Sequence, residues 1–236
     1  MASGNVVHLQ NAAAPEPANA DGWFRLGLAQ MDSGLLEQAE SSFRRVLRLD
    51  PRHAKAGINL GTVLQFAGRG DEAETCYRNA LAVAPELAQG WFNLGTNLLG
   101  RGRARGAIEP LRRAIDLDPG CAAWHAALAS ALERADRLPE ALESARAAVR
   151  LEPDLTPAQE QLAGCLQRLG DHAAALAACR TAIDLGVQSQ FIQSTTLDAL
   201  SFLPQATPEQ LHEQHAGWGK RLAGLAASWT PDRDAD

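Results

Sequence analysis

Residues 23–51 read WFRLGLAQMDSGLLEQAESSFRRVLRLDP, and the pattern of this stretch returns every 34 residues. A Leu-Gly pair starts at Leu26, Leu60 and Leu94, and a Leu-Ala pair follows in the same step at Leu128 and Leu162. Two further series keep this step, and they are Ala39, Ala73, Ala107, Ala141 and Ala175, and Pro51, Pro85, Pro119 and Pro153. Three series with one period indicate a chain built from repeated structural units.

Each unit has the pattern of two helices joined by a tight turn. Apolar or small residues recur at helical spacing, stop at a glycine, and then resume. The glycines that interrupt the pattern are Gly34, Gly68, Gly102 and Gly170. Composition agrees, because Ala and Leu make up 78 of the 236 residues, whereas Val and Ile together number 12. Since sheets favour β-branched residues, we expect an all-α fold.

The first unit resembles the tetratricopeptide repeat (TPR) family in Trp23, Leu26, Gly27, Ala39, Phe43 and Pro51. The resemblance covers five units, which are 20–53, 54–87, 88–121, 122–155 and 156–189. It implies a right-handed superhelix, an α-solenoid of about five helix-turn-helix repeats. Small residues at positions 8 and 20, counted from the first residue of each unit, would let its two helices approach closely. No single helix pair can bury its apolar face alone, so neighbouring units supply the core.

The last two units depart from the family pattern at packing positions. Unit 4 has Asp136 in place of the turn glycine, Ala145 at the aromatic position and His125 at the tryptophan position. Unit 5 has Cys179 at the aromatic position. We therefore expect looser packing toward the C-terminal end. Pro110 lies inside the second helix of unit 3, where we expect a tolerated kink.

Both ends of the chain lie outside the period. Residues 1–19 are expected to form a disordered N-terminal segment, and residues 228–236 a tail. Residues 190–227 are expected to form a C-terminal helical extension that covers the last repeat, with one helix at 190–203 and a second at 208–227. Packing of these C-terminal helices on another copy of the chain would give a homo-oligomer.

The run STTLDALSFLPQATPEQLHEQHAGWGKRLA resembles the stretch that joins the TPRs to the catalytic half in bacterial relatives of O-linked N-acetylglucosamine transferase. The residues that carry the resemblance are Ser194, Leu197, Leu200, Pro204, Thr207, Pro208, Glu209, His215, Trp218 and Gly219. The resemblance implies the substrate-selecting TPR half of a protein O-glycosyltransferase, without the catalytic half that binds the sugar nucleotide. The alternative is a stand-alone TPR adaptor.

Charge and cysteine usage argue against several classes of function. The net charge is −6, so a nucleic-acid partner is not expected, because phosphate binding requires a basic surface. No apolar run is long enough for a membrane-spanning helix, so no membrane partner is expected. The four cysteines lack a metal-binding spacing and fit free thiols in a reducing, cytoplasmic environment. Arg outnumbers Lys by 20 to 2, a composition typical of a GC-rich bacterial genome.

No group of side chains has the spacing of a catalytic site, so we expect neither an enzyme nor a bound cofactor or metal. His212 and His215 stand three residues apart, whereas the metalloprotease motif places its histidines four apart. The run from Gly100 to Gly106 is interpreted as the turn of unit 3 rather than as a phosphate loop. The arginines in and after it are expected on a solvated face, or against an acidic partner, and they are Arg101, Arg103, Arg105, Arg112 and Arg113.

The resemblance to TPRs also implies a binding groove, because the first helix of each TPR lines a concave surface. Asn59 with Thr62, and Asn93 with Thr96, stand at positions 6 and 9 of adjacent units. An Asn amide offers both a donor and an acceptor, which match a peptide bond. These pairs resemble the asparagine ladder of the transferase TPRs, which holds an extended polypeptide by its backbone. The alternative is a set of ordinary exposed polar residues.

We therefore expect a protein-interaction module that binds a protein or peptide ligand in this groove. Flanking contacts would come from Phe24, Lys55, Gln65, Phe66, Gln89 and Phe92. The other TPR mode, a clamp for two carboxylates, needs Lys at position 5. That mode is not expected, because the residues at position 5 are Phe24, Ile58, Phe92, Ala126 and Glu160.

Overall fold

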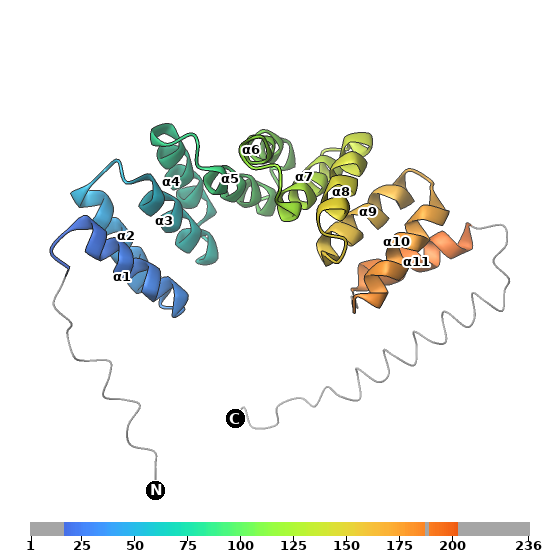
Figure 1. Ribbon diagram of the computed structural model, residues 1–236, viewed down its shortest axis with the longest axis horizontal. Coiled ribbons are helices and arrows are strands. Elements are labelled where there is room, and N and C mark those ends of the chain that lie inside the picture. Colours follow the sequence, from blue (N-terminus) through green and yellow to red (C-terminus); the bar gives the residue numbers. More distant parts are fainter. Residues whose placement is uncertain (1–16, 187–188, 203–236) are drawn as a thin grey trace, which may run out of the picture. The chain divides into compact units, whose positions relative to one another are not determined.

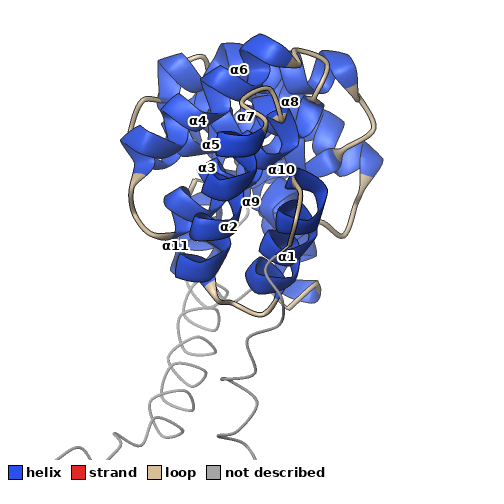
Figure 2. Cartoon of the chain, turned by 90° about the vertical axis from the view of Figure 1, so that its left-hand side faces the viewer, coloured by secondary structure: helices blue, strands red, loops and turns tan. Residues whose placement is uncertain are grey.

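The computed structural model describes residues 17–186 and 189–202 of the chain, which contain eleven α-helices and no strand (Figures 1 and 2). Ten of the helices form five consecutive helix-turn-helix pairs. The pairs are α1 (Ala20–Asp32) with α2 (Leu36–Leu49), α3 (Ala54–Phe66) with α4 (Gly70–Val83), α5 (Ala88–Gly100) with α6 (Ala104–Leu117), α7 (Ala122–Arg134) with α8 (Leu138–Leu151), and α9 (Thr156–Arg168) with α10 (His172–Asp184). The predicted all-α repeat fold is confirmed.

The described residues divide into two compact units, one within residues 1–119 and the other within residues 120–236. In the first, α1 to α6 pack in chain order, so that α2 contacts α3 and α4 contacts α5. In the second, α7 to α10 pack in the same way, and α11 (Gln190–Ser201) packs against both α9 and α10. The expected helix at 190–203 is therefore present as α11. The expected helix at 208–227 lies outside the described residues, and so does the oligomer contact that it would make. Residues 1–16 and the tail at 228–236 lie outside them as well. The boundaries of the five repeats stay a prediction.

Each helix pair turns through one residue with left-handed backbone. In four pairs this residue is glycine, with φ between 73° and 83°, at Gly34, Gly68, Gly102 and Gly170. In the α7–α8 pair it is Asp136, with φ of 61°. The turn is otherwise unchanged, because Asp136 N donates to Glu133 O at 3.0 Å, as Gly102 N does to Leu99 O. Asp136 therefore adopts a conformation that is unfavourable for residues with a Cβ.

Within each pair, the residues at positions 8 and 24 fit together by size. A Cβ added at Gly27, Gly61 or Gly95 would lie 2.6 to 2.7 Å from the side chain at position 24 of the same pair. The position 24 residues there are Phe43, Tyr77 and Leu111. In the two C-terminal pairs, Ala129 and Ala163 replace the glycines, and Ala145 and Cys179 replace the large residues. These four smaller side chains are fully buried, at 0% exposure.

The side chain at position 24 is therefore smaller in the C-terminal pairs but equally buried, and the helices of each pair stay in contact. The looser packing expected for the C-terminal repeats stays a prediction. Pro110 is buried within α6, and the helix continues through it to Leu117, as expected for a tolerated proline.

Replacing Asp136 with glycine should raise the free energy of unfolding by roughly 0.5–1 kcal/mol, because it removes the left-handed strain. The change also removes an exposed ion pair to Arg168 at 3.0 Å, which contributes little. Urea denaturation measures the effect. Asp136→Asn is the control, since it removes the charge and keeps a residue that tolerates this backbone. Equal stability of Asp136→Gly and the wild type would contradict the strain assignment.

The fit between positions 8 and 24 predicts a coupling between Gly95 and Leu111. Gly95→Ala creates a clash and Leu111→Ala creates a cavity, so each alone should destabilise the fold. The double variant reproduces the pair Ala129 and Ala145 and should be more stable than the sum of the two changes by about 1–2 kcal/mol. A double-mutant cycle in denaturant measures this coupling.

Gly106→Ala is the matched control for Gly95→Ala, because a Cβ at Gly106 meets no atom within 4 Å. In open space on a helix, this change should stabilise by roughly 0.5–1 kcal/mol. Additive effects of Gly95→Ala and Leu111→Ala would show that the two positions do not compete for space.

Candidate functional site

The predicted groove residues all lie on the first helices of the three N-terminal pairs. Phe24 is in α1, and the others are in α3 and α5. The α3 residues are Lys55, Asn59, Thr62, Gln65 and Phe66, and the α5 residues are Gln89, Phe92, Asn93 and Thr96. We call this set the A-helix surface. It belongs to one compact unit of the chain.

A chain of hydrogen bonds joins α3 to α5 on the A-helix surface. Gln89 Nε2 donates to Asn93 Oδ1 at 2.7 Å, and Asn93 Nδ2 donates to Thr62 Oγ1 at 3.1 Å. The Tyr77 hydroxyl lies 3.0 Å from Gln65 Oε1 and 3.3 Å from Thr62 Oγ1. Burial raises the pKa of Tyr77 to about 12, so this hydroxyl keeps its proton and donates it at neutral pH. The chain therefore fixes the Asn93 amide at both of its ends.

Asn59 differs from Asn93, although the two stand at the same position of adjacent repeats. The Asn59 side chain is half-buried and makes no hydrogen bond with the described residues. The residue equivalent to Thr62 in the first repeat is Leu28, which has no side-chain donor or acceptor, and the residue equivalent to Gln89 is Lys55. The Asn59 amide thus has its hydrogen-bonding capacity available for another molecule.

The aromatic side chains of the A-helix surface also differ in their surroundings. Phe24 packs inward, with its ring 6.0 Å from Phe43 and 4.7 Å from His53 between centroids. Phe92 is half-buried. Phe66 is 72% exposed at the end of α3. Of the three predicted flanking rings, Phe66 therefore presents most of its surface for contact with a ligand.

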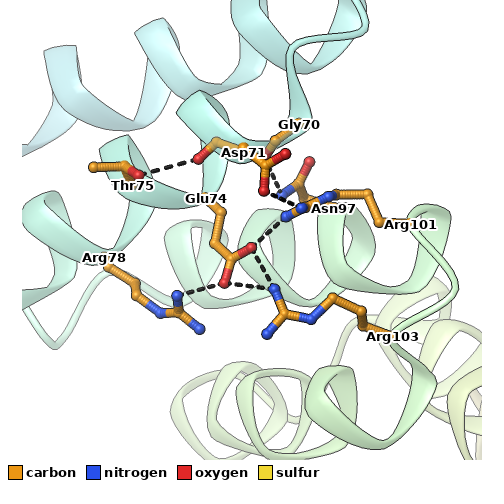
Figure 3. Close-up of polar contacts among 8 residues, drawn as sticks. All are labelled: Gly70, Asp71, Glu74, Thr75, Arg78, Asn97, Arg101 and Arg103. Carbon is orange, nitrogen blue, oxygen red and sulfur yellow. Dashed lines mark hydrogen bonds and ion pairs between the residues drawn. The ribbon is translucent and has the colours of Figure 1, made fainter.

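Sequence reasoning missed a buried carboxylate between two repeats. Glu74 of α4 is 5% exposed and contacts three guanidinium groups (Figure 3). Arg78 comes from the same helix, whereas Arg101 and Arg103 come from the turn between α5 and α6. Arg103 Nη1 lies 2.7 Å from Glu74 Oε2, and Arg101 also pairs with Asp71.

The expectation of a solvated arginine face is therefore wrong for Arg101, whose side chain is half-buried, whereas Arg103 is exposed and also pairs with Glu74. They hold the turn of the third repeat against α4 of the second. The interface between the first and second repeats has a similar ion pair, in which Arg69 lies 2.7 Å from Glu40. The two residues of this pair are 29 positions apart in the sequence, as are Glu74 and Arg103. A search for opposite charges at that recurring spacing could have found them.

Burial alone would raise the pKa of the Glu74 carboxyl, because it removes solvent from the charge. The nearby charges of Arg78 and Arg103, with hydrogen bonds from Arg101 and Arg103, outweigh burial, and the net pKa is lowered. Glu74 is therefore ionised at neutral pH. Its contribution to stability is present above the unfolded value, about 4.3, and is lost as the pH falls through the folded pKa.

Three of the four cysteines are thiols whose burial disfavours the thiolate. Burial raises the pKa of Cys76 and Cys179, and it raises the pKa of Cys165 to about 12. All four thiols are free. In the part of the chain that the structure describes, no three His, Cys, Asp or Glu residues form a possible metal site. His212 and His215 lie outside that part.

Models of the tetratricopeptide repeat match residues 20–53, 58–120 and 92–156, which together make up more than half of the chain. The chain belongs to the tetratricopeptide repeat family, whose fold serves protein interaction. No curated protein matches it in sequence. No helix among the described residues is long and apolar enough to cross a membrane.

Several solved structures share the fold at low sequence identity. The PilF protein of Pseudomonas aeruginosa is 22% identical with a TM-score of 0.75, over 89% of this chain and 93% of that one. YrrB, described as a TPR protein with an unusual peptide-binding site, is 22% identical with a TM-score of 0.66, over 75% and 91%. MamA of Desulfovibrio magneticus RS-1 is 19% identical with a TM-score of 0.67, over 72% and 96%.

These matches give no support to the resemblance to the glycosyltransferase linker. They concern TPR repeats and a TPR fold. The residues that carried the resemblance from Pro204 onward lie outside the described part of the chain.

Replacing Glu74 with glutamine should lower the free energy of unfolding at pH 7 by about 2 kcal/mol, because three arginines lose their buried counter-charge. The difference from the wild type should shrink as the pH falls below the unfolded value of about 4.3 and through the lowered pKa of Glu74, below which Glu74 is also neutral. Denaturation curves across this pH range measure it. Asp71→Asn is the control: its side chain is 88% exposed, and its loss should change stability little. A pH-independent difference would contradict the charge argument.

Proposed function

We propose that this chain binds an extended polypeptide along the A-helix surface, mainly through the backbone of the ligand. The observation that carries the proposal is the half-buried Asn59 amide, which has no hydrogen-bond partner among the described residues. A peptide group would supply the acceptor for its N–H and the donor for its C=O.

Asn93 adds a second contact of a different kind. Its Oδ1 and Nδ2 each have one hydrogen bond within the protein, which leaves one N–H and one lone pair for a ligand. Because the side chain is already held in place, its ordering costs little on binding. The surface thus combines an unengaged amide at Asn59 with a pre-ordered amide at Asn93.

The spacing of the repeats suits an extended chain. Packed helices lie about 10 Å apart, and an extended polypeptide advances about 3.3 Å per residue. Equivalent asparagines in adjacent repeats would therefore meet roughly every third peptide group. Exposed Phe66 and Lys55 would contact ligand side chains beside this row. Recognition of the backbone implies broad tolerance of ligand sequence and modest affinity, since ordering a flexible peptide opposes binding.

The proposal is tested with unstructured 15-residue peptides selected from a random library on the wild-type protein. Asn59→Ala combined with Asn93→Ala should weaken the selected peptides more than tenfold, which corresponds to about 1.4 kcal/mol or more. Asn79→Ala on α4 is the matched control and should leave affinity unchanged. Calorimetry measures binding, and circular dichroism checks that the helical content is retained.

N-methylation of single peptide bonds in a selected ligand separates backbone from side-chain recognition. If the backbone carries the binding, methylation at every third position should abolish it while other positions tolerate it. Unchanged affinity in the Asn59 and Asn93 variant would overturn the proposal. A ligand that tolerates methylation throughout would do the same.

A further inference from the structure

Position 4 of the repeat donates a hydrogen bond to the loop that precedes its own repeat. In the third repeat, Trp91 Nε1 donates to the carbonyl oxygen of Pro85 at 2.8 Å. In the fifth repeat, Gln159 Nε2 donates to the carbonyl oxygen of Pro153, also at 2.8 Å. Two chemically different side chains make the same bond at the same distance. The position therefore supplies an N–H group to a proline carbonyl.

The second repeat lacks this donor, because its fourth residue is Gly57. The loop before it has kept its conformation: the residue before the proline has φ of −137° at both Asp50 and Ala84. The Pro51 carbonyl accepts no hydrogen bond from the described residues. The second repeat therefore lacks both the aromatic ring and the N–H donor that Trp91 supplies in the third repeat.

A cavity of about 200 Å³ opens at this place, between α2, α3 and α4. Its apolar wall consists of Leu47, Ala80 and Val83, and Pro51, Gly57 and Cys76 also line it. In the third repeat, Trp91 lines a groove with Leu81 and Pro110, the residues equivalent to Leu47 and Cys76. The cavity is thus the counterpart of a space where the next repeat has an indole ring. A cavity of roughly 150 Å³ in another protein is already large enough for benzene.

The lining of the cavity favours an uncharged ligand. Burial raises the pKa of the Cys76 thiol, so the sulfur stays protonated. His53 also lines the cavity, and its Nδ1 accepts a hydrogen bond from Ala56 N at 3.1 Å. No arginine, lysine or carboxylate lines the cavity. Asn79, which is uncharged, lines it as well. The cavity therefore offers dispersion contacts and neutral hydrogen-bonding groups, among them the Pro51 carbonyl.

We propose that this cavity binds a planar, neutral aromatic ring with one N–H donor, of which indole is an example that matches the ring of Trp91. The N–H donates to the Pro51 carbonyl, as Trp91 does to Pro85, and the ring packs against Leu47, Ala80 and Val83. The site is distinct from the A-helix surface and does not depend on the proposed peptide binding.

Titration of the full chain with indole, followed by calorimetry or by amide chemical shifts, tests the proposal. Indole should bind with a Kd of about 1 mM or tighter, as expected for a small, efficient ligand. Benzothiophene has a similar ring without the N–H, and it should bind at least about fivefold more weakly. N-acetyl-tryptophanamide presents the same ring as a side chain. Its binding would assign the site to a tryptophan of a partner, whereas binding of indole alone would assign it to a free small molecule.

Two variants fill the cavity from different helices. Gly57→Trp places the missing ring in it and should abolish indole binding. A Cβ at Gly57 would lie 3.1 Å from Ala80 Cβ, so α3 and α4 must shift slightly to accept it. Cys76→Met narrows the cavity from α4 without that contact and should weaken indole binding at least about tenfold. Gly100→Trp is the matched control: a Cβ there meets no atom within 4 Å, and binding should be unchanged.

The proposal fails if indole does not bind the wild-type chain, or if benzothiophene binds equally well. It also fails if a folded Cys76→Met variant binds indole as the wild type does.

Discussion

The close approach of the two helices within each pair is the constraint on which the rest of the structure depends. At this contact, position 8 and position 24 share one volume. Glycine faces a large residue in the N-terminal pairs, and alanine stands with a small residue in the C-terminal ones. An added methyl at Gly61 would clash with Tyr77, whereas loss of that ring would leave a cavity. Both positions are buried in every pair and the two helices stay in contact, although the individual residues vary.

A fixed geometry within the pairs brings the same positions of neighbouring repeats together. Glu40 meets Arg69, and Glu74 meets Arg103, at an equal separation in the sequence. Thr62 of α3 contacts Asn93 of α5 for the same reason, because equivalent positions of adjacent repeats lie next to each other. The polar contacts between repeats therefore follow from the period that builds the core. Where an interface carries a buried charge, as at Glu74, the partner arginines are required by its desolvation, since an unpaired carboxylate there would be costly.

This dependence explains what the sequence could and could not predict. The helices, their order and their turns follow from period and composition, because these are properties of one repeat. The glycine column even marks the left-handed turn residue, and Asp136 fits the same backbone. The state of each groove residue is a property of two repeats. Asn59 and Asn93 stand at the same position, and their surroundings differ through the preceding repeat, with Leu28 for one and Thr62 for the other, and through Lys55 and Gln89 of their own repeats. The pairing of Arg101 with Glu74 was missed for the same reason.

In a repeat protein, equivalent positions can be compared within one chain, since each position occurs several times on nearly the same backbone. A departure at one copy then identifies what the others supply. Gln159 in place of tryptophan keeps the bond to Pro153, so the N–H group is supplied there without the ring. Gly57 removes both, and the space and the carbonyl remain. Such sites differ from an ordinary packing defect, because the equivalent residue defines the shape and the polarity of the missing group. The two proposed binding sites of this chain both lie where a repeat departs from its neighbours while its backbone does not.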